Sequence, residues 1–324
     1  MILSYILFAN HIKKMNFLNL IRYKNLLMLA FMQLLFRFDF FYLQHIPLAL
    51  NNWQFALLVL STVLIAAAGY VINDIFDQDT DAINKPTKVI VGKSISESNA
   101  YSIYAGLNIT GVCIGFYLSN VIMKPSFATV FILIAATLYI YATSLKHIAI
   151  LGNVIVALVL SMSVIILGVF DIYPITSYAN QAVMANLFSI VLDYAVFAFM
   201  INFLREIIKD IEDIKGDEAQ GMKTLPILIG VSKSGKIVSV LSVIPIIFLF
   251  QYVNNFFVRN SLYFATAYAF IFVLAPLLYF TIKTGGAKTK EDFHTLSCIL
   301  KWILFFGILS IIIITLNIQY NATR

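Results

Sequence analysis

Acidic residues are scarce in this sequence of 324 residues, which holds only 16 Asp and Glu, and most of them gather at two places. The first place is the segment GYVINDIFDQDTDAINKPTK. Its chemically important residues stand at positions i, i+1, i+4 and i+8, and they are Asn73, Asp74, Asp77 and Asp81. On a helix, residues at this spacing share one face, so the segment predicts a row of oxygen ligands.

The second place is the segment LREIIKDIEDIKGDEAQGMKTLP. Here Asp210, Asp213 and Asp217 stand at positions i, i+3 and i+7, and Glu206 precedes them by one turn. This spacing again puts the acids on one face of a helix. The sequence therefore holds two acidic helical faces of similar design.

Carboxylates that converge near a membrane surface repel one another, and each charged group at membrane depth costs roughly 2.5 to 3.5 kcal/mol. A cation should compensate this charge. Oxygen ligands without His or Cys suit Mg²⁺, which typically takes one or two carboxylates together with phosphate oxygens of a substrate. A solvated acidic loop is the alternative for one isolated cluster, but two clusters of the same spacing favour a Mg²⁺ site for a diphosphate substrate.

The composition shows where these clusters must be held. The chain is 61% hydrophobic and 12% charged, and its mean hydropathy is +0.90. A soluble globule of this composition would expose large apolar surfaces, so we exclude one. The apolar residues are spread along the whole chain, which indicates a polytopic membrane protein in which no soluble domain is tethered by a single anchor.

Apolar runs of about 17 to 25 residues predict the membrane spans. Nine are present, near residues 24–46, 53–73, 99–120, 126–146, 150–170, 182–205, 236–253, 262–282 and 296–318. The runs lack the alternation of barrel strands, and backbone groups in lipid must pair within the span, so we expect helices. The predicted fold is all-α, with nine transmembrane helices around a central cavity.

The expected organisation is a cytoplasmic N-terminal segment, residues 1–23, followed by one transmembrane domain, residues 24–324. Met1 and Met15 are both possible starts. Lys and Arg concentrate in the N-terminal segment and in the connections after the second, fourth, sixth and eighth spans, whereas the other connections hold only Lys124 and Arg259. This asymmetry predicts a cytoplasmic N-terminus and cytoplasmic acidic clusters, in a multi-pass protein of the cell membrane.

With these motifs, the chain resembles the UbiA superfamily of intramembrane prenyltransferases. That family carries N-D-x-x-D-x-x-x-D after its second helix and D-x-x-D-x-x-x-D after its sixth, and both motifs are complete here. The resemblance extends to Arg22 and Asn25, to YATSLK at residues 141–146 with Gly152 and Asn153, and to residues 223–226. After the first motif the family often has N-R-P-x-R, whereas this chain has Asn84, Lys85, Pro86, Thr87 and Lys88. Lysine keeps the charge but loses the bidentate fork of arginine.

The resemblance implies a Mg²⁺-dependent enzyme that ionises an allylic diphosphate and transfers its prenyl group to a lipophilic acceptor. The implied metal ligands are Asn73, Asp74, Asp77, Asp81, Asp210, Asp213 and Asp217, and among these Asp77 and Asp213 are the expected catalytic residues. The implied diphosphate contacts are Arg22, Lys85, Lys88, Tyr141, Ser144, Lys146 and Lys223. Each basic residue among them also fits the alternative of an ordinary charge on the cytoplasmic side.

The acceptor is predicted from one segment only. REIIKDIEDIKGD followed by KTLP is most similar to the branch of the family that makes digeranylgeranylglyceryl phosphate, whose acceptor is a glycerol-phosphate lipid. An aromatic acceptor, such as 4-hydroxybenzoate, a naphthoate or homogentisate, is the alternative. A cation transporter is the alternative of another class, but its acids would lie near the bilayer midplane. The length of the prenyl chain and the oligomeric state stay open, and nothing indicates a nucleic-acid partner.

Arg37, Asp39 and Asp193 lie well inside predicted spans, where an ionisable residue is a candidate functional residue by default. Arg37 and Asp39 lie in the first span, and we expect them either to serve the reaction or to satisfy each other or polar groups of neighbouring helices. Asp193 lies in the sixth span, and the sequence assigns it no role.

Overall fold

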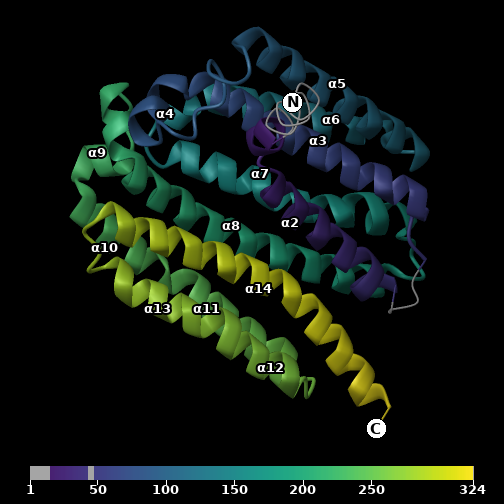
Figure 1. Ribbon diagram of the computed structural model, residues 1–324. Helices are drawn as coiled ribbons and strands as arrows, with labels where there is room; N and C mark the ends of the chain where they lie inside the picture. Colours follow the sequence, from purple (N-terminus) through teal and green to yellow (C-terminus); the bar gives the residue numbers. More distant parts are fainter. Residues whose placement is uncertain (1–14, 43–46, 324) are drawn as a thin grey trace, which may run out of the picture. The chain divides into compact units, whose positions relative to one another are not determined.

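The computed structural model describes residues 15–42 and 47–323. The predicted choice between Met1 and Met15 concerns residues 1–14, which lie outside this part of the chain. The described residues are helical almost throughout and form no strand beyond two isolated bridges, Val91 with Ile95 and Ile148 with Lys223. Because backbone groups in lipid must be paired within a helix or a closed barrel, this all-helical content fits a chain that spans a membrane (Figure 1).

The chain divides into two compact units that interleave along the sequence. Of the described residues, the first unit comprises residues 15–30, 50–146 and 215–221, and the second comprises residues 31–42, 47–49, 147–214 and 222–323. The predicted division into residues 1–23 and a single domain of residues 24–324 stays a prediction.

The first unit is built around the second predicted span. Its elements are the start of α2 (Tyr23–Leu34), α3 (Asn52–Phe76), α4 (Gln78–Asn84), α5 (Glu97–Val121), the 3₁₀ turn η2 (Pro125–Phe127), α6 (Ala128–Thr143), the start of η3 (Leu145–His147) and the end of α8 (Gln181–Ala219). Helix α3 packs against both α5 and α6 (Figure 1). A Cβ atom at Gly115 of α5 would lie 2.3 Å from the Phe131 ring of α6, so glycine permits this close helix packing.

The second unit holds the remaining elements. These are η1 (Leu35–Phe41), α7 (Leu151–Leu167), η4 (Gly168–Ile172), η5 (Tyr173–Ile175), most of α8, α9 (Leu225–Ile229), α10 (Val231–Leu241), α11 (Val243–Tyr252), η6 (Val253–Val258), α12 (Tyr263–Ala269), η7 (Phe270–Leu274), α13 (Ala275–Thr284) and α14 (Lys290–Ala322). Helix α14 packs along α12 and α13. The core of this unit is a continuous cluster of buried aliphatic and aromatic side chains from α8 to α14.

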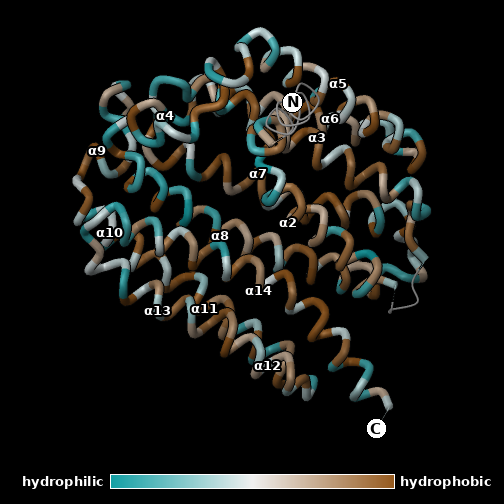
Figure 2. The backbone as a smooth tube through the Cα atoms, in the orientation of Figure 1, coloured by the Kyte–Doolittle hydropathy of each residue, from teal (hydrophilic) through white to brown (hydrophobic). Residues whose placement is uncertain are grey.

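Eight helices in the described residues are long and apolar enough to cross a membrane, and they coincide with the second to ninth predicted spans. The first predicted span, residues 24–46, coincides with α2 and η1, which end at Phe41, and residues 43–46 lie outside the described part. The protein is therefore a polytopic helical membrane protein. Hydrophobic residues run along most of α14 and hydrophilic residues gather around α4 (Figure 2).

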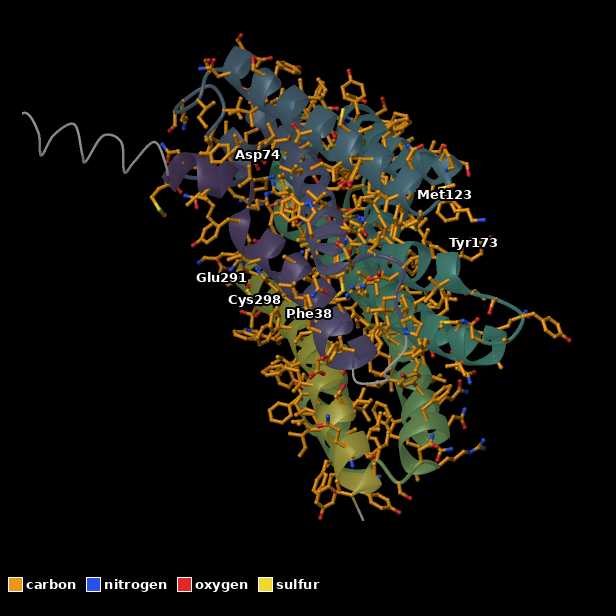
Figure 3. All side chains as sticks on the ribbon, turned by 90° about the vertical axis from the view of Figure 1, so that its right-hand side faces the viewer. Phe38, Asp74, Met123, Tyr173, Glu291 and Cys298 are labelled. Atoms are coloured by element: carbon orange, nitrogen blue, oxygen red, sulfur yellow. The ribbon has the colours of Figure 1, made fainter. Side chains whose placement is uncertain are left out.

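Large apolar side chains on the outside of the helices agree with this conclusion. Phe38, Met123 and Tyr173, labelled in Figure 3, are 46%, 82% and 51% exposed. An exposed apolar side chain is costly in water but is in its preferred solvent in lipid.

The partner of Arg37 agrees with one of the alternatives from the sequence, a polar group of a neighbouring helix. Arg37 donates to Asp171 of η4 over 2.7 Å, and the two side chains are 7% and 0% exposed. The alternative in which Arg37 pairs with Asp39 is wrong. Both members of the pair lie in π-helical turns, η1 and η4, which places the ion pair where each helix widens.

Candidate active site

The first acidic motif lies at the junction of two helices. Asn73 and Asp74 belong to the last turn of α3, and Asp81 belongs to α4. Between them Asp77 has φ −97° and ψ 6°, and its backbone N–H donates to the carbonyl of Asn73 over 2.9 Å. The motif thus follows one helical path with a local change of geometry at Asp77, where the sequence predicts one uninterrupted face.

Asp74 forms an ion pair with Arg22, which precedes α2. The guanidinium donates to Asp74 over 2.8 Å and lies over the Tyr70 ring, 4.8 Å from its centroid. Tyr70 precedes Asp74 by one turn of α3, and its hydroxyl accepts from Asn25 over 3.3 Å. The Arg22 side chain is 36% exposed, so the pair is open to exchange with another anion.

Asp77 is bound from two sides. Its Oδ1 accepts from Lys146 Nζ over 2.5 Å, and its Oδ2 accepts from Asn73 Nδ2 over 2.5 Å. Lys146 follows α6 and is 69 residues away in the sequence, so the packing of α6 on α3 brings the pair together. Charge-assisted bonds of this kind are stronger than neutral ones, and they hold the Asp77 side chain in place.

Asp81 and Lys85 complete this face. Burial raises the pKa of Asp81, and the Asp77 carboxylate raises it further, whereas the Lys85 ammonium lowers it. An acid in such surroundings gains most from an added cation. The loop after α4 is closed by Lys93, whose ammonium donates to the carbonyl of Pro86 over 2.9 Å, and Lys88 is exposed on this loop.

The end of the second motif belongs to the same unit as the first motif. The backbone N–H of Gly216, in the last turns of α8, donates to Asn84 Oδ1 over 2.9 Å. A Cβ at Gly216 would lie 2.4 Å from the Asn84 amide and 2.7 Å from the Thr80 carbonyl, so only glycine allows this approach. The next residue is Asp217, which is 7% exposed. The first unit therefore brings Asp217 beside the helix that carries Asp81.

The rest of the second motif lies in the second unit. Asp210 Oδ2 accepts from Asn153 of α7 over 2.8 Å, and Asn153 is 6% exposed. Asp213 is half-buried on α8. Glu206, one turn before Asp210, is 7% exposed and accepts from Lys209 over 2.9 and 3.0 Å. Glu206 is thus engaged by a neighbouring lysine of its own helix.

Three further residues are predicted diphosphate contacts. Ser144 follows α6 and is exposed, and its hydroxyl lies 3.4 Å from the hydroxyl of Thr143. Tyr141 is half-buried on α6. Lys223 belongs to the second unit, where its backbone N–H donates to the carbonyl of His147 over 3.0 Å and its side chain is exposed.

The sequence assigns no role to Tyr70, Asn84 or Asn153, which hold site residues in place. Tyr70 could have been found from its spacing, because it stands four residues before Asp74 on the same helical face. Asn153 was visible only as part of the family resemblance. The partners of Asn84 and Asn153 are 132 and 57 residues away in the sequence, so no local pattern indicates these contacts.

The donor chemistry of both motifs fits Mg²⁺. Every candidate ligand offers a carboxylate or amide oxygen, which this hard cation prefers. Within residues 15–42 and 47–323, no three acidic, His or Cys side chains are grouped as a ready metal cage. In the first unit the positive charges of Arg22 and Lys146 compensate Asp74 and Asp77.

A polytopic helical bundle with acidic and basic side chains at the ends of its spans is what an intramembrane enzyme for an anionic substrate requires. Comparison with known proteins gives the particular family. The UbiA prenyltransferase family matches residues 34–305, which is most of the chain, so this chain belongs to the UbiA prenyltransferase family and is a prenyltransferase.

Curated relatives agree with this membership. The chain is 29% identical to the digeranylgeranylglyceryl phosphate synthase of Thermococcus kodakarensis, over 81% of this chain and 86% of the relative. It is 32% identical to the enzyme of the same name from Sulfurisphaera tokodaii, over 64% of this chain and 68% of the relative.

Solved structures share the fold. One, described as digeranylgeranylglyceryl phosphate synthase in membranes, superposes with a TM-score of 0.60 at 23% identity and covers 93% of this chain and 99% of its own. A UbiA homologue from Archaeoglobus fulgidus, bound to DMAPP and Mg²⁺, superposes with a TM-score of 0.57 at 15% identity and covers 91% of this chain and 99% of its own. The expected all-helical UbiA fold is therefore confirmed.

Proposed function

We propose that this prenyltransferase moves an isoprenyl group from a prenyl diphosphate to a glycerol-phosphate lipid of the geranylgeranylglyceryl phosphate type. The observation that carries the acceptor is the similarity to enzymes named digeranylgeranylglyceryl phosphate synthase, one of which is matched over 86% of its length. The donor class is supported by UbiA homologues whose structures hold DMAPP or GPP with Mg²⁺.

The proposed metal ligands come from both motifs. They are Asn73, Asp74, Asp77, Asp81, Asp210, Asp213 and Asp217, with Asp77 and Asp213 central to activity. When bound, Mg²⁺ neutralises charge on the departing diphosphate and so lowers the barrier to ionisation. The all-oxygen donor set supports Mg²⁺ over softer metals.

We propose that Arg22 and Lys146 act on the diphosphate by exchanging partners. Each is held against a motif carboxylate, Arg22 by Asp74 and Lys146 by Asp77. With a diphosphate and its cation bound, Asp74 and Asp77 would hold the metal, and Arg22 and Lys146 would bind the phosphate oxygens. Arg22 can bind them bidentately, and Lys146 acts as a point charge. Arg22 and Lys146 thus compensate the charge of the carboxylates before substrate binding and the charge of the diphosphate after it.

The transfer step breaks the bond between carbon 1 of the prenyl group and the diphosphate oxygen. The acceptor hydroxyl oxygen attacks carbon 1, a carbon–oxygen bond forms, and the hydroxyl proton passes to an oxygen of the departing diphosphate. Lys85, Lys88, Lys223, Tyr141 and Ser144 are the proposed further contacts to the departing diphosphate. Water must be excluded because it would otherwise react with the allylic cation at carbon 1 of the prenyl group. Burial among membrane-spanning helices supplies that exclusion.

A panel of acceptors tests the proposed function. Membranes that contain the protein are incubated with labelled geranylgeranyl diphosphate and with geranylgeranylglyceryl phosphate, 4-hydroxybenzoate or a naphthoate. We expect a product only with the glycerol phosphate, and strong discrimination against its dephosphorylated form, because the lost phosphate leaves buried donors unpaired. Prenylation of an aromatic acceptor alone would refute the lipid acceptor and leave the family unchanged. Cation flux in proteoliposomes without any transfer would favour a transporter.

We also propose that the N-terminus and both motifs face the cytoplasm. Cysteine accessibility tests this orientation, with single cysteines placed at Gln78 and Gln220. The native Cys113 and Cys298 are both exposed and must first be replaced by serine. We expect both probes to be labelled only from the cytoplasmic side. Labelling of the two positions from opposite sides would contradict a shared site.

A further inference from the structure

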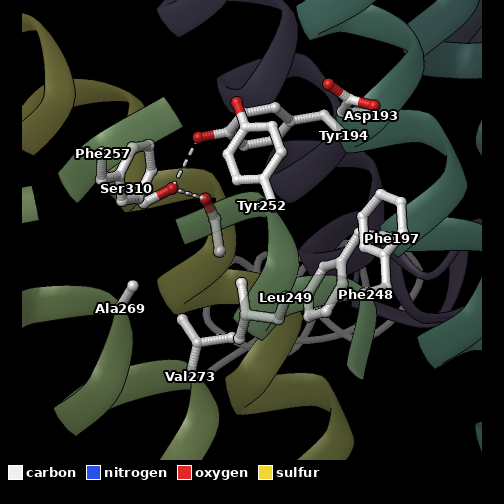
Figure 4. Close-up of a pocket in the computed structure, with 11 residues that line it drawn as sticks. Asp193, Tyr194, Phe197, Phe248, Leu249, Tyr252, Phe257, Ala269, Val273 and Ser310 are labelled. Carbon is white, nitrogen blue, oxygen red and sulfur yellow. Dashed lines mark hydrogen bonds between the residues drawn. The ribbon is translucent and has the colours of Figure 1, made fainter. Parts of the chain in front are cut away.

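The second unit contains a pocket that the proposed reaction does not use. It opens among α8, α11, α12, α14 and the π-helical turns η6 and η7, and it has a cavity volume of about 40 Å³ (Figure 4). A cavity needs about 10 to 15 Å³ of such volume to hold one water molecule, so this one can admit a small group such as the head of a ligand.

The pocket has one polar end and one apolar end. Figure 4 shows the Asp193 carboxyl and the hydroxyls of Tyr194 and Tyr252 toward one end, and Leu249 and Val273 toward the other. Such a lining suits an amphiphile, whose chain contacts the aliphatic residues and whose head reaches the polar end.

One polar group at the polar end, the Asp193 carboxyl, has no hydrogen-bond donor among the described residues. Tyr194 is engaged, because its hydroxyl lies 2.6 Å from the hydroxyl of Ser310. Asp193 is half-buried and has no hydrogen-bond or ion-pair partner in the part of the chain that the structure describes. Tyr252 is close enough to Asp193 to interact with it electrostatically. A carboxyl within a membrane span that lacks a protein partner points to a ligand with a hydrogen-bond donor.

The pocket is separate from the acids of the second motif. Asp193 precedes Asp210 on α8 by 17 residues, which corresponds to about 25 Å along the helix. Its own negative charge disfavours a phosphate or carboxylate head. The ligand is therefore not the diphosphate donor bound through its head.

We propose that this pocket binds a long-chain alcohol. A hydroxyl head both donates and accepts, so it can donate to the Asp193 carboxyl and accept from the Tyr252 hydroxyl. An ammonium head only donates, and it would leave Tyr252 without an acceptor on the ligand. Leu249, Ala269 and Val273 line the aliphatic end, where the part of the chain next to the head can pack against them.

Photolabelling in nanodiscs tests this proposal. The probe is a C16 alcohol that carries a diazirine in its chain, and labelled peptides are mapped by mass spectrometry. We expect labels in the peptides that contain residues 193–197 and 248–257, and competition by hexadecanol but not by palmitate or hexadecylamine. Asp193→Asn keeps the size of the side chain and should lower labelling about tenfold, because a bond to a charged acceptor is lost.

Matched variants separate binding from general effects. Tyr252→Phe should lower labelling several-fold, and Ala269→Phe should abolish it by filling the aliphatic end. Asp39→Asn, another acid at membrane depth, and Tyr263→Phe, on the exposed side of α12, do not line the pocket and should label like the wild type. Equal labelling of Asp193→Asn and wild type, or competition by palmitate or hexadecylamine as strong as by hexadecanol, would overturn the proposal.

Discussion

The two units each contain an ion pair that links distant parts of the chain, and the pairs differ in exposure. In the first unit the Arg22 and Asp74 side chains are 36% and 15% exposed. In the second unit the Arg37 and Asp171 side chains are 7% and 0% exposed. An exposed pair can exchange its partners for a ligand at little cost, whereas a buried pair must stay together because each charge alone would be poorly solvated. We therefore expect similar chemistry to serve binding in the first unit and structure in the second.

The strongest test of this contrast is to break the buried pair. Arg37→Met should destabilise the protein by about 3 to 5 kcal/mol, because it leaves the Asp171 carboxylate buried without its cation. The melting temperature in detergent should fall by roughly 6 to 10 °C. The double variant Arg37→Met, Asp171→Leu should regain most of the loss, since a hydrophobic pair of similar volume is often as stable. If KM of folded Arg37→Met for the prenyl diphosphate rose strongly, the pair would belong to the site.

The motif acids should behave in the opposite way. Asp77→Asn and Asp213→Asn keep the volume of the side chain but remove the charge proposed to hold Mg²⁺. We expect kcat to fall about 10² to 10³-fold, in line with about 3 to 4 kcal/mol of lost electrostatic stabilisation. Asp213→Asn should change the melting temperature little, whereas Asp77→Asn should also lower it, because Lys146, which is 7% exposed, loses its anion. Excess EDTA should stop the wild-type enzyme to a similar extent.

Each motif offers a matched control for these substitutions. Asp79 is exposed on α4, two residues after Asp77, and Glu218 is exposed at the end of α8. Asp79→Asn and Glu218→Gln should keep wild-type rates. Glu212→Gln is a poorer control, because Glu212 accepts from His294 over 2.9 Å if the imidazole donates. Wild-type rates in the Asp77 and Asp213 variants would refute the proposed metal site.

A smaller effect is expected where α8 meets α4. Gly216→Ala would push the Asn84 amide and the Thr80 carbonyl away and so shift Asp217 relative to Asp81. Overpacking of this kind costs about 1 to 3 kcal/mol. We expect the apparent affinity for Mg²⁺ to fall several-fold while expression and insertion persist. Gly221→Ala is a control at a glycine with open space around it, although its φ of +67° adds local strain. An unchanged Mg²⁺ titration of Gly216→Ala would show that the contact does not position Asp217.

The smallest effect should follow Arg22→Lys. This change keeps a cation beside Asp74 but removes the bidentate fork that we propose for the diphosphate. KM for the prenyl diphosphate should rise about 3- to 10-fold with kcat nearly unchanged. Arg205→Lys serves as a control, because Arg205 faces Glu206 at 3.7 Å and has no proposed contact with substrate. Unchanged KM in Arg22→Lys would argue against the exchange of partners.

The sequence predicts the spans because a long apolar run is enough to identify a membrane helix. Residues 53–73 and 150–170 are two examples. It also identifies the acids, since their rarity makes two regular clusters conspicuous. What it misses depends on contacts between distant segments. The pairing of Arg37 with Asp171 joins residues 134 positions apart, and the nearer Asp39 looks equally suitable from the sequence.

The helical junction at Asp77 and the pocket at Asp193 were invisible for a related reason. Nothing local ends α3 at Phe76, because no Gly or Pro follows there. The Asp193 carboxyl is recognisable as part of a pocket only in the structure, where α11 and α14 place Tyr252 and Ser310 around the same cavity. The spacing of Asp210, Asp213 and Asp217 was easier to interpret, because all three lie on α8.

Helix α8 runs without interruption for 39 residues, which is about 58 Å and nearly twice the thickness of the hydrocarbon core. Because the helix is continuous, the angle of the acids around the helix axis is set by the span that precedes them. An insertion of one residue between Ala198 and Asp210 would turn every later side chain by about 100° and carry the acids off their face. Only insertions or deletions close to a whole number of helical turns would keep the acids on the same side of the helix relative to the span. This stretch of the chain should therefore evolve by substitution, and its length should be the same in active relatives.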